Sequence, residues 1–283
     1  MLANSFLKHI SELHGFQIVD HKPLSGGDIN EVYLLETKSE KLVVKVNDAE
    51  KFPAMFEMEK DGLNRLAEAK TLRIPEVIAV GEAEKLSYLI LENVEKSPQI
   101  TDFWEVFGDK IAKLHQNSSS HFGLEKDNYI GSLPQINAFN DNAASFYIEQ
   151  RLEPQFKLAL DKGYIFKDLS DFYNSIEKII PDEPPALIHG DLWSGNFLID
   201  DVGMPCLIDP AVAYAPREID LALMQLFGGF DEQLFKTYNE VFPLENDWQE
   251  RIKLFQLYHV LVHVNLFGGG YFSQAKSIMK QYL

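Results

Sequence analysis

A chain of 283 residues, 46% of them hydrophobic, is long enough to bury one large core or two smaller ones. Its formal net charge of −17 and its lack of any Lys or Arg cluster exclude a nucleic-acid partner, which requires a basic surface. The single cysteine, Cys206, cannot build a disulfide framework or a thiolate metal site, so we expect a small buried hydrophobe. No segment has the apolar length of a membrane span or of a signal peptide, which predicts a cytoplasmic protein without membrane contact.

The first third of the chain has the signals of a small antiparallel sheet. Residues 1–15 have the spacing of an amphipathic helix. Residues 29–37 and 41–47 are β-branched or apolar runs around a polar turn, which predicts a hairpin. Residues 54–69 follow as a helix with one apolar face, and residues 77–94 predict two further strands around a polar turn.

The pattern then changes to long helices, which predicts an N-terminal lobe of residues 1–94 and a mainly helical C-terminal lobe of residues 95–283. The long predicted helices are 101–116, 141–163 and 248–269. Residues 120–140 contain too much Gly, Asn and Pro for a helix and predict a surface loop. Because long ordered loops in compact domains are often functional, we treat this loop as part of a candidate site.

Several residues of the N-terminal lobe indicate a phosphate-binding site. Gly26 and Gly27 lie between two strands, where a glycine pair lets backbone amides approach a phosphate, although an ordinary turn would also use them. Lys45 is central in a β-branched run, so it points either into the domain or to solvent from an edge strand. Glu59 on the next helix is either a surface charge or the partner that holds the Lys45 ammonium.

A second set of polar side chains lies in HGDLWSGN (189–196) and LIDP (207–210). Asp191 and Asn196 occupy a loop after a strand-like run, and Asp209 ends another short strand. A strand–loop–strand hairpin would bring the three side chains together. Two of them would then suit Mg²⁺, and the remaining carboxylate would accept a proton from a hydroxyl. The alternative is that these side chains only cap turns.

Taken in this order, the features match the parts that kinases use for phosphoryl transfer from ATP. Those parts are a Gly-rich loop, a strand lysine paired with a helix glutamate, a catalytic Asp with an Asn five residues later, and a second metal-binding Asp. Asp191 is therefore predicted to be the catalytic base, and Asn196 and Asp209 are predicted to be the metal ligands.

The segment HGDLWSGN, with Gly190 where protein kinases have Arg, resembles the aminoglycoside phosphotransferase and choline kinase group of kinase-like enzymes. More narrowly, the whole chain resembles the fructosamine kinase (ketosamine-3-kinase) family. The matching stretches span residues 24–230 and are LSGGDINEVYLL, VVKVN, FEMEKDGLNRL, DNYIGSLPQIN, FYIEQRLEPQ, LIHGDLWSGNFL and IDPAVAYAPREIDLALMQLFGGF. The last two are specific for the family rather than for kinase-like proteins at large.

This resemblance implies an α+β, bilobal protein-kinase-like fold, in which a small antiparallel sheet lobe carries one main helix and a larger lobe is mainly helical. It implies ATP and Mg²⁺ as cofactors and transfer of the γ-phosphate to a sugar hydroxyl of a ketosamine, of the fructosamine or ribulosamine type, in deglycation. The acceptor would be a small-molecule ketosamine or a glycated lysine, and a monomer is favoured over an oligomer. Some relatives carry a cysteine in the Gly-rich loop, but Asp28 and Ile29 stand there in this chain, which excludes a thiol switch in that loop.

The resemblance also implies roles for individual residues. Glu92 and Val94 fall at the hinge, where backbone groups would bond the adenine. Trp193, inside the catalytic loop, is expected to contact the sugar, with core packing as its alternative role. His189 is expected to bond the loop backbone rather than to act as a catalyst. The acceptor pocket is expected on the C-terminal lobe, bordered by Trp193 and residues 127–137.

Two other functions compete with this one. The first is a small-molecule kinase for an aminoglycoside, choline or homoserine, against which the PQIN and GGF segments count. The second is a catalytically silent scaffold that binds nucleotide. Loss of Lys45, Asp191, Asn196 or Asp209 would indicate a scaffold, and all four residues are present.

Overall fold

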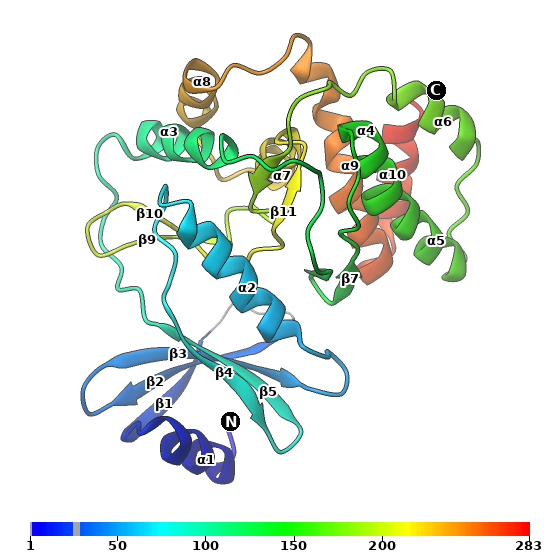
Figure 1. Cartoon of the computed structure of the whole chain (residues 1–283). Helices are drawn as coiled ribbons and strands as arrows, with labels where there is room; N and C mark the ends of the chain where they lie inside the picture. Colours follow the sequence, from blue (N-terminus) through cyan, green and yellow to red (C-terminus); the bar gives the residue numbers. More distant parts are fainter. Residues whose placement is uncertain (1, 25–28) are drawn as a thin grey trace. The chain divides into compact units, whose positions relative to one another are not determined.

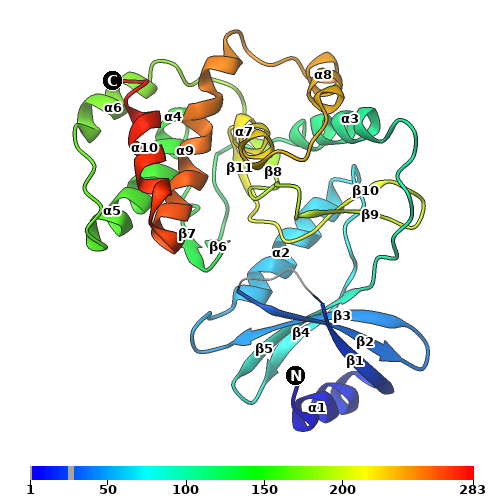
Figure 2. The same cartoon turned by 180° about the vertical axis from the view of Figure 1, so that it is seen from behind.

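The structure, a computed structural model, describes residues 2–24 and 29–283. The chain divides into two compact units, Met1–Ile100 with Phe197–Asp209, and Thr101–Asn196 with Pro210–Leu283. Figures 1 and 2 show their elements from opposite sides. The predicted α+β class is confirmed, because the first unit contains an antiparallel sheet and the second is mainly helical. The lobe boundary between residues 94 and 95 stays a prediction.

The first unit is built on a five-stranded antiparallel sheet. Its strands, in spatial order, are β1 (Ile18–Leu24), β2 (Glu31–Thr37), β3 (Lys41–Asp48), β5 (Leu86–Glu92) and β4 (Val77–Ala83). The predicted hairpin is confirmed as the β2–β3 pair, and the two strands predicted after the helix are confirmed as β4 and β5.

Two helices cover opposite faces of this sheet (Figure 1). On one face, Phe6 and Ile10 of α1 (Asn4–His14) pack in a buried cluster with the apolar side chains of β2, β3 and β5. On the other face, α2 (Met55–Glu68) packs Phe56 and Leu63 against β5. Both helices were predicted from their spacing. Because side chains alternate along a strand and Val44 belongs to the α1 cluster, Lys45 faces α2.

A short hairpin from much later in the chain completes the first unit. Its strands are β9 (Phe197–Ile199) and β10 (Pro205–Leu207). The amide of Leu207 donates to the carbonyl of Arg73 over 3.0 Å, and the amide of Ser97 donates to the carbonyl of Asp200 over 3.2 Å. Cys206 of this hairpin is fully buried, as predicted, and burial raises the pKa of its thiol to about 12.

The second unit is a set of helices around a small two-stranded sheet. Its helices are α3 (Phe103–His115), α4 (Ala143–Phe146), the π-helix η1 (Tyr147–Leu152), α5 (Glu153–Asp161), α6 (Leu169–Ile176), α7 (Glu218–Phe227), α8 (Glu232–Val241), α9 (Trp248–Phe267) and α10 (Gly270–Met279). The sheet pairs β8 (Ala186–Ile188) with β11 (Ala213–Ala215). Helix α9 contributes many side chains to the core, and Figure 2 shows it beside α7 and α10. None of the helices in the described ranges combines the length and the apolar composition that crossing a membrane requires.

The prediction of a surface loop over residues 120–140 is wrong in part. The segment is not helical, but it contains a hairpin of β6 (Asn128–Ile130) and β7 (Leu133–Gln135), and the side chains of Asn128, Gln135 and Asn137 are buried. Gln135 donates to Asn128 Oδ1 over 2.8 Å, and Asn137 donates to the same oxygen over 3.0 Å. Burial is tolerated because the amides bond one another, which a count of polar residues does not reveal.

The helix predicted over residues 141–163 is interrupted by the π-helix η1. Pro154 lies in the first turn of α5 and lacks the amide that would bond the carbonyl of Gln150 in a continuous α-helix. That carbonyl accepts a hydrogen bond from Arg151 Nη1 over 3.1 Å instead. The other donors of the buried Arg151 reach Ile136 O and Asn137 Oδ1, so the irregular turn ties the helix to the 120–140 segment.

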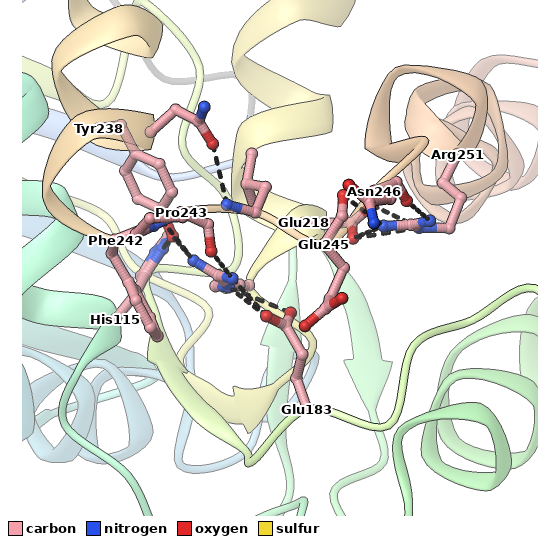
Figure 3. Close-up of polar contacts among 12 residues, drawn as sticks. His115, Glu183, Glu218, Tyr238, Phe242, Pro243, Glu245, Asn246 and Arg251 are labelled. Atoms are coloured by element: carbon pink, nitrogen blue, oxygen red, sulfur yellow. Dashed lines mark hydrogen bonds and ion pairs between the residues drawn. The ribbon is translucent and has the colours of Figure 1, made fainter.

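Two buried guanidinium groups fix the start of α7 and α9 (Figure 3). Arg251 forms an ion pair with Glu218 at 2.7 Å and also donates to Asn246 O over 2.8 Å. Arg217 pairs with Glu183 and donates to the carbonyl of Phe242 over 2.8 Å. The guanidinium groups thus join α7 to the loops around it.

We expect Arg251→Leu to lower the free energy of unfolding by about 3–5 kcal/mol, because the Glu218 carboxylate stays buried without its cation. Urea denaturation at pH 7 measures this loss. The exposed pair of Lys113 and Asp109 is the matched control, since Lys113→Leu should cost less than about 1 kcal/mol. The double variant Arg251→Met/Glu218→Leu should recover most of the loss, because apolar side chains replace both charges. Equal losses in Arg251→Leu and Lys113→Leu would contradict a role for the buried pair.

Candidate active site

The ammonium group of Lys45 lies between two carboxylates in the first unit. Its Nζ is 2.7 Å from Glu59 Oε1 and 2.9 Å from Asp209 Oδ1, and the side chain is 6% exposed. Burial by itself lowers the pKa of Lys45, but the two carboxylates outweigh it and raise that pKa above its ordinary value. The predicted pair of Lys45 and Glu59 is therefore confirmed, and the lysine is held fully charged.

The loop between β8 and β9 contains the HGDLWSGN segment. The amide nitrogen of Asn196 donates to the carbonyl of Asp191 over 2.8 Å and to its carboxylate Oδ2 over 3.1 Å. His189 is fully buried, and its Nδ1 accepts from the amide of Asp191 over 3.2 Å. His189 thus bonds the loop backbone, as predicted. The loop folds back on itself so that the two polar side chains predicted from the spacing meet.

Gly190 is required where it stands, because its φ is +82° and an added Cβ would lie 2.0 Å from the carbonyl oxygen of Ala211. The backbone around it is held by Asp220 of α7. The amides of His189 and Gly190 donate to the two oxygens of the Asp220 carboxylate over 2.7 Å and 2.8 Å. The residue before the predicted base is therefore fixed by both sterics and hydrogen bonds.

Asp220 is fully buried and is also 3.2 Å from His115 Nε2. Burial by itself would raise the pKa of Asp220, but the hydrogen bond from His115, the charges of His115 and His189 and the backbone amide of Gly190 lower it overall. The Asp220 carboxylate therefore stays ionised and strengthens each hydrogen bond that it accepts. His115 is in turn bonded through Nδ1 to Tyr238 over 2.9 Å, as Figure 3 shows.

His259 of α9 reaches the same loop from another side. Its Nε2 is 2.9 Å from the carbonyl oxygen of Gly190, and the ring is 1% exposed. Burial lowers the pKa of His259 to about 4. Sequence reasoning assigned no role to Asp220 or His259. The signal that would have found them is a single polar side chain inside an apolar helical run, as in EIDLALM and LYHVLV.

Trp193 is 40% exposed, so the alternative role of core packing is wrong. Its indole lies over Gly195, where an added Cβ would be 2.3 Å from the ring. The neighbouring Ser194 contacts a second glycine turn, because a Cβ on Gly229 would lie 2.6 Å from its Cβ. Phe227, two residues before that turn, is 43% exposed. Aromatic surface therefore borders the loop.

The segment 127–137 is bonded to the chain that follows the loop. Asn128 donates to the carbonyl of Val212 over 2.9 Å, and Gln135 donates to that of Ala211 over 3.1 Å. The hydroxyl of Tyr258 donates to Gln135 Oε1 over 2.6 Å. These bonds fix the predicted pocket segment against Ala211, whose carbonyl also lies close to Gly190, and against its neighbour Val212 and Tyr258.

At the predicted hinge, Glu92 is bonded inside its own unit. Its carboxylate pairs with Arg73 at 2.9 Å, and its amide donates to the carbonyl of Glu76 over 3.0 Å. Val94 is buried. Adenine binding by Glu92 and Val94 stays a prediction. Gly26 and Gly27 lie outside the described residues.

The predicted metal ligands present oxygen donors of the type that Mg²⁺ prefers. Asn196 carries a side-chain amide oxygen, and its amide nitrogen donates to Asp191. Asp209 carries a carboxylate that pairs with Lys45, and its side chain is 41% exposed. No group of three or more His, Cys, Asp or Glu side chains that could hold a metal occurs among residues 2–24 and 29–283. The chemistry of each side chain, an amide oxygen and a carboxylate oxygen, fits Mg²⁺ rather than a softer cation.

The chain matches the family model for fructosamine kinase over residues 3–283. It is 40% identical to a probable ketoamine kinase of Synechocystis, with 98% of this chain and 95% of that protein covered. It is 36% identical to a chloroplastic protein-ribulosamine 3-kinase of Arabidopsis thaliana, with 97% and 86% covered.

Solved structures of two other proteins have folds similar to that of this chain. A crystal structure of a candidate fructosamine-3-kinase from Thermobifida fusca matches with a TM-score of 0.88 and 32% identity, covering 99% of each chain. An aminoglycoside phosphotransferase matches with a TM-score of 0.61 and 17% identity, covering 100% of each chain, which shows a shared kinase-like fold.

The lowered pKa of His259 leads to a pH dependence of stability. The folded ring takes up a proton only near pH 4, whereas the unfolded ring does so near pH 6.5. The unfolded state therefore binds more protons between these values, and we expect the free energy of unfolding to fall by up to about 1.4 kcal/mol per pH unit from pH 6.5 to 4. The charge of Asp220 raises the pKa of His259 and so opposes the effect of burial, whereas the charges of His263 and Arg151 lower it further.

Urea denaturation over pH 4–7 measures this slope, and the His259→Gln variant is the comparison. Replacing the ring by an amide that does not titrate should flatten the profile in this window. Loss of the Asp220 carboxylate charge falls in a lower window, because its pKa is depressed below 3.8. A profile equally steep in both proteins would remove His259 as the cause.

Proposed function

Because the chain belongs to the fructosamine kinase family and is a phosphotransferase, we propose that it transfers the γ-phosphate of ATP to a sugar hydroxyl of a ketosamine, in deglycation. The observation that carries the phosphoryl-transfer part is the Lys45 ammonium held between Glu59 and Asp209. The names of the relatives support the acceptor, since they include ketoamine kinases and a ribulosamine kinase.

The first unit supplies the phosphate side of the site. A fixed, fully charged ammonium is suited to the α- and β-phosphates of the nucleotide. Glu59 holds it in place, and backbone groups at Glu92 and Val94 would bond the adenine. Gly26 and Gly27 would place backbone amides near the phosphates. Mg²⁺, when bound through Asn196 and Asp209, supplies charge neutralisation at the phosphate oxygens.

Asp191 is the proposed general base. Its carboxylate would take the proton of the attacking sugar hydroxyl, whose oxygen forms the new bond to the γ-phosphorus while the bond to the bridging oxygen breaks and ADP leaves. Asn196 holds that carboxylate through its amide nitrogen, so one oxygen is fixed before the acceptor arrives. A base that is already oriented loses less conformational entropy when the transition state forms.

The acceptor would bind beside Trp193 and the 127–137 segment. A ketosamine joins a polyhydroxylated sugar to a protonated amine. The exposed indole can pack on the C–H face of the sugar and attract the cation, with a cation–π contribution of about 0.5–2 kcal/mol. The net charge of −17 also raises the local concentration of cationic acceptors.

Phosphorylation of a panel of acceptors tests the proposal. We expect the protein with ATP and Mg²⁺ to phosphorylate a fructosyl-amine or a ribulosyl-amine in preference to an aminoglycoside or choline, measured by ADP release and by the mass of the product. Chelation of Mg²⁺ should abolish turnover. Asp191→Asn should lower kcat by about 10²–10⁴-fold while ATP still binds. Turnover of an aminoglycoside or choline with no reaction of a ketosamine would show that the acceptor is wrong.

Trp193→Ala should raise KM for the ketosamine or lower its turnover, because the sugar and the amine lose the indole face. Slow hydrolysis of ATP by water should stay nearly unchanged, since the phosphate side is intact. Trp193→Phe keeps an aromatic face and serves as the matched control, so it should retain more of the ketosamine activity. If Trp193→Ala lowered both reactions equally, the indole would act on the loop rather than on the acceptor.

A further inference from the structure

We propose that His259 is a positioning residue that sets the direction of the Asp191 carboxylate by holding the carbonyl of Gly190. This inference rests on the proposed role of Asp191 as the base. It starts from the peptide group between Gly190 and Asp191, since the orientation of that group decides where the Asp191 side chain points.

Glycine has no Cβ to restrict its backbone, so rotation at Gly190 is limited only by what surrounds it. The carbonyl of Ala211 closes the space on one side. Asp220 accepts the amide hydrogens of His189 and Gly190, which fixes the chain before the glycine. The carbonyl of Gly190 lies beyond these bonds, and His259 Nε2 contacts it at 2.9 Å. His259 therefore restrains the carbonyl end of the peptide that leads into Asp191, while the amide end of that peptide donates to His189 Nδ1 over 3.2 Å.

The hydrogen-bonding groups of the His259 ring are consistent with a single hydrogen bond to Gly190. A carbonyl oxygen only accepts, so His259 must carry its hydrogen on Nε2. Nδ1 of the neutral ring then holds a lone pair, and it bonds to no partner among the residues that the structure describes. An apolar side chain at this buried position would avoid the free-energy cost of burying an unpaired nitrogen. The histidine is thus explained by the bond from Nε2 to Gly190.

Helix α9 carries His259 as a rigid support. The helix is buried on several sides, with Tyr258 and Val260 on either side of the histidine both at 1% exposure or less. The same helix bonds the 127–137 segment through Tyr258. One helix therefore positions both the proposed base and one border of the proposed acceptor site. Displacing a reacting group by about 1 Å can cost on the order of 10²-fold in rate.

The test compares kcat and KM for His259→Leu, His259→Gln and the control Gln256→Leu. Gln256 lies on the same helix, is equally buried and donates to a backbone carbonyl away from the loop, that of Ala222, over 3.0 Å. We expect His259→Leu to lower kcat by about 10²-fold with little change in KM for ATP. The amide of His259→Gln can still donate to Gly190 and should restore most of kcat. Gln256→Leu should lose a similar stability and keep kcat.

A double-mutant cycle separates positioning from general damage. In an Asp191→Asn background, His259→Leu should cause no further loss of the residual activity, because it acts through Asp191. An additive loss, or a kcat for His259→Leu no lower than that for Gln256→Leu, would overturn the proposal. Should His259→Leu not fold, His259→Asn replaces it, because its shorter amide does not reach Gly190. Full activity of Asp191→Asn would instead refute the proposed base, so the two failures can be told apart.

Discussion

A buried carboxylate, that of Asp220, organises the backbone on which the candidate active site stands. It is fully buried, and a charge in that position is tolerated only when donors surround it. Two of these donors are backbone amides at the start of the HGDLWSGN loop, and another is His115. The same bonds that satisfy the carboxylate therefore hold the loop. The carboxylate and the loop depend on each other, since either partner left alone would be an unpaired polar group in the core.

In the first unit, a buried cation is likewise stabilised by groups of opposite charge that lie beside it. Lys45 is buried on the α2 face of the sheet and keeps its proton because Glu59 and Asp209 lie beside it. Burial raises the pKa of Glu59, and the ammonium of Lys45 opposes that shift. Asp209 comes from the late hairpin that is bonded to Arg73. A charge network thus joins residues far apart in the sequence within one compact unit.

The 120–140 segment shows how polar residues become part of a core. Its buried amides bond one another, Arg151, Tyr258 and the chain after the HGDLWSGN loop. Each such network has a definite geometry, because every donor must meet an acceptor. A loop tied in this way presents a fixed surface rather than a mobile one. This rigidity is a reason to expect binding selectivity at the segment.

Patterns along the chain were sufficient to predict the helices and strands with clear periodicity, the residues of the HGDLWSGN loop and the pairing of Lys45 with Glu59. Those features follow from local spacing and from a recognisable set of chemical parts. The folded chain was needed to find the contacts of Asp220 and His259, the burial of Asn128 and Gln135, and the π-helix before Pro154. The physical reason is that a polar side chain is acceptable inside a core when its partner is there, and that partner lies far away in the chain. Local patterns therefore predict which residues can do chemistry, while long-range contacts decide which residues hold them in place.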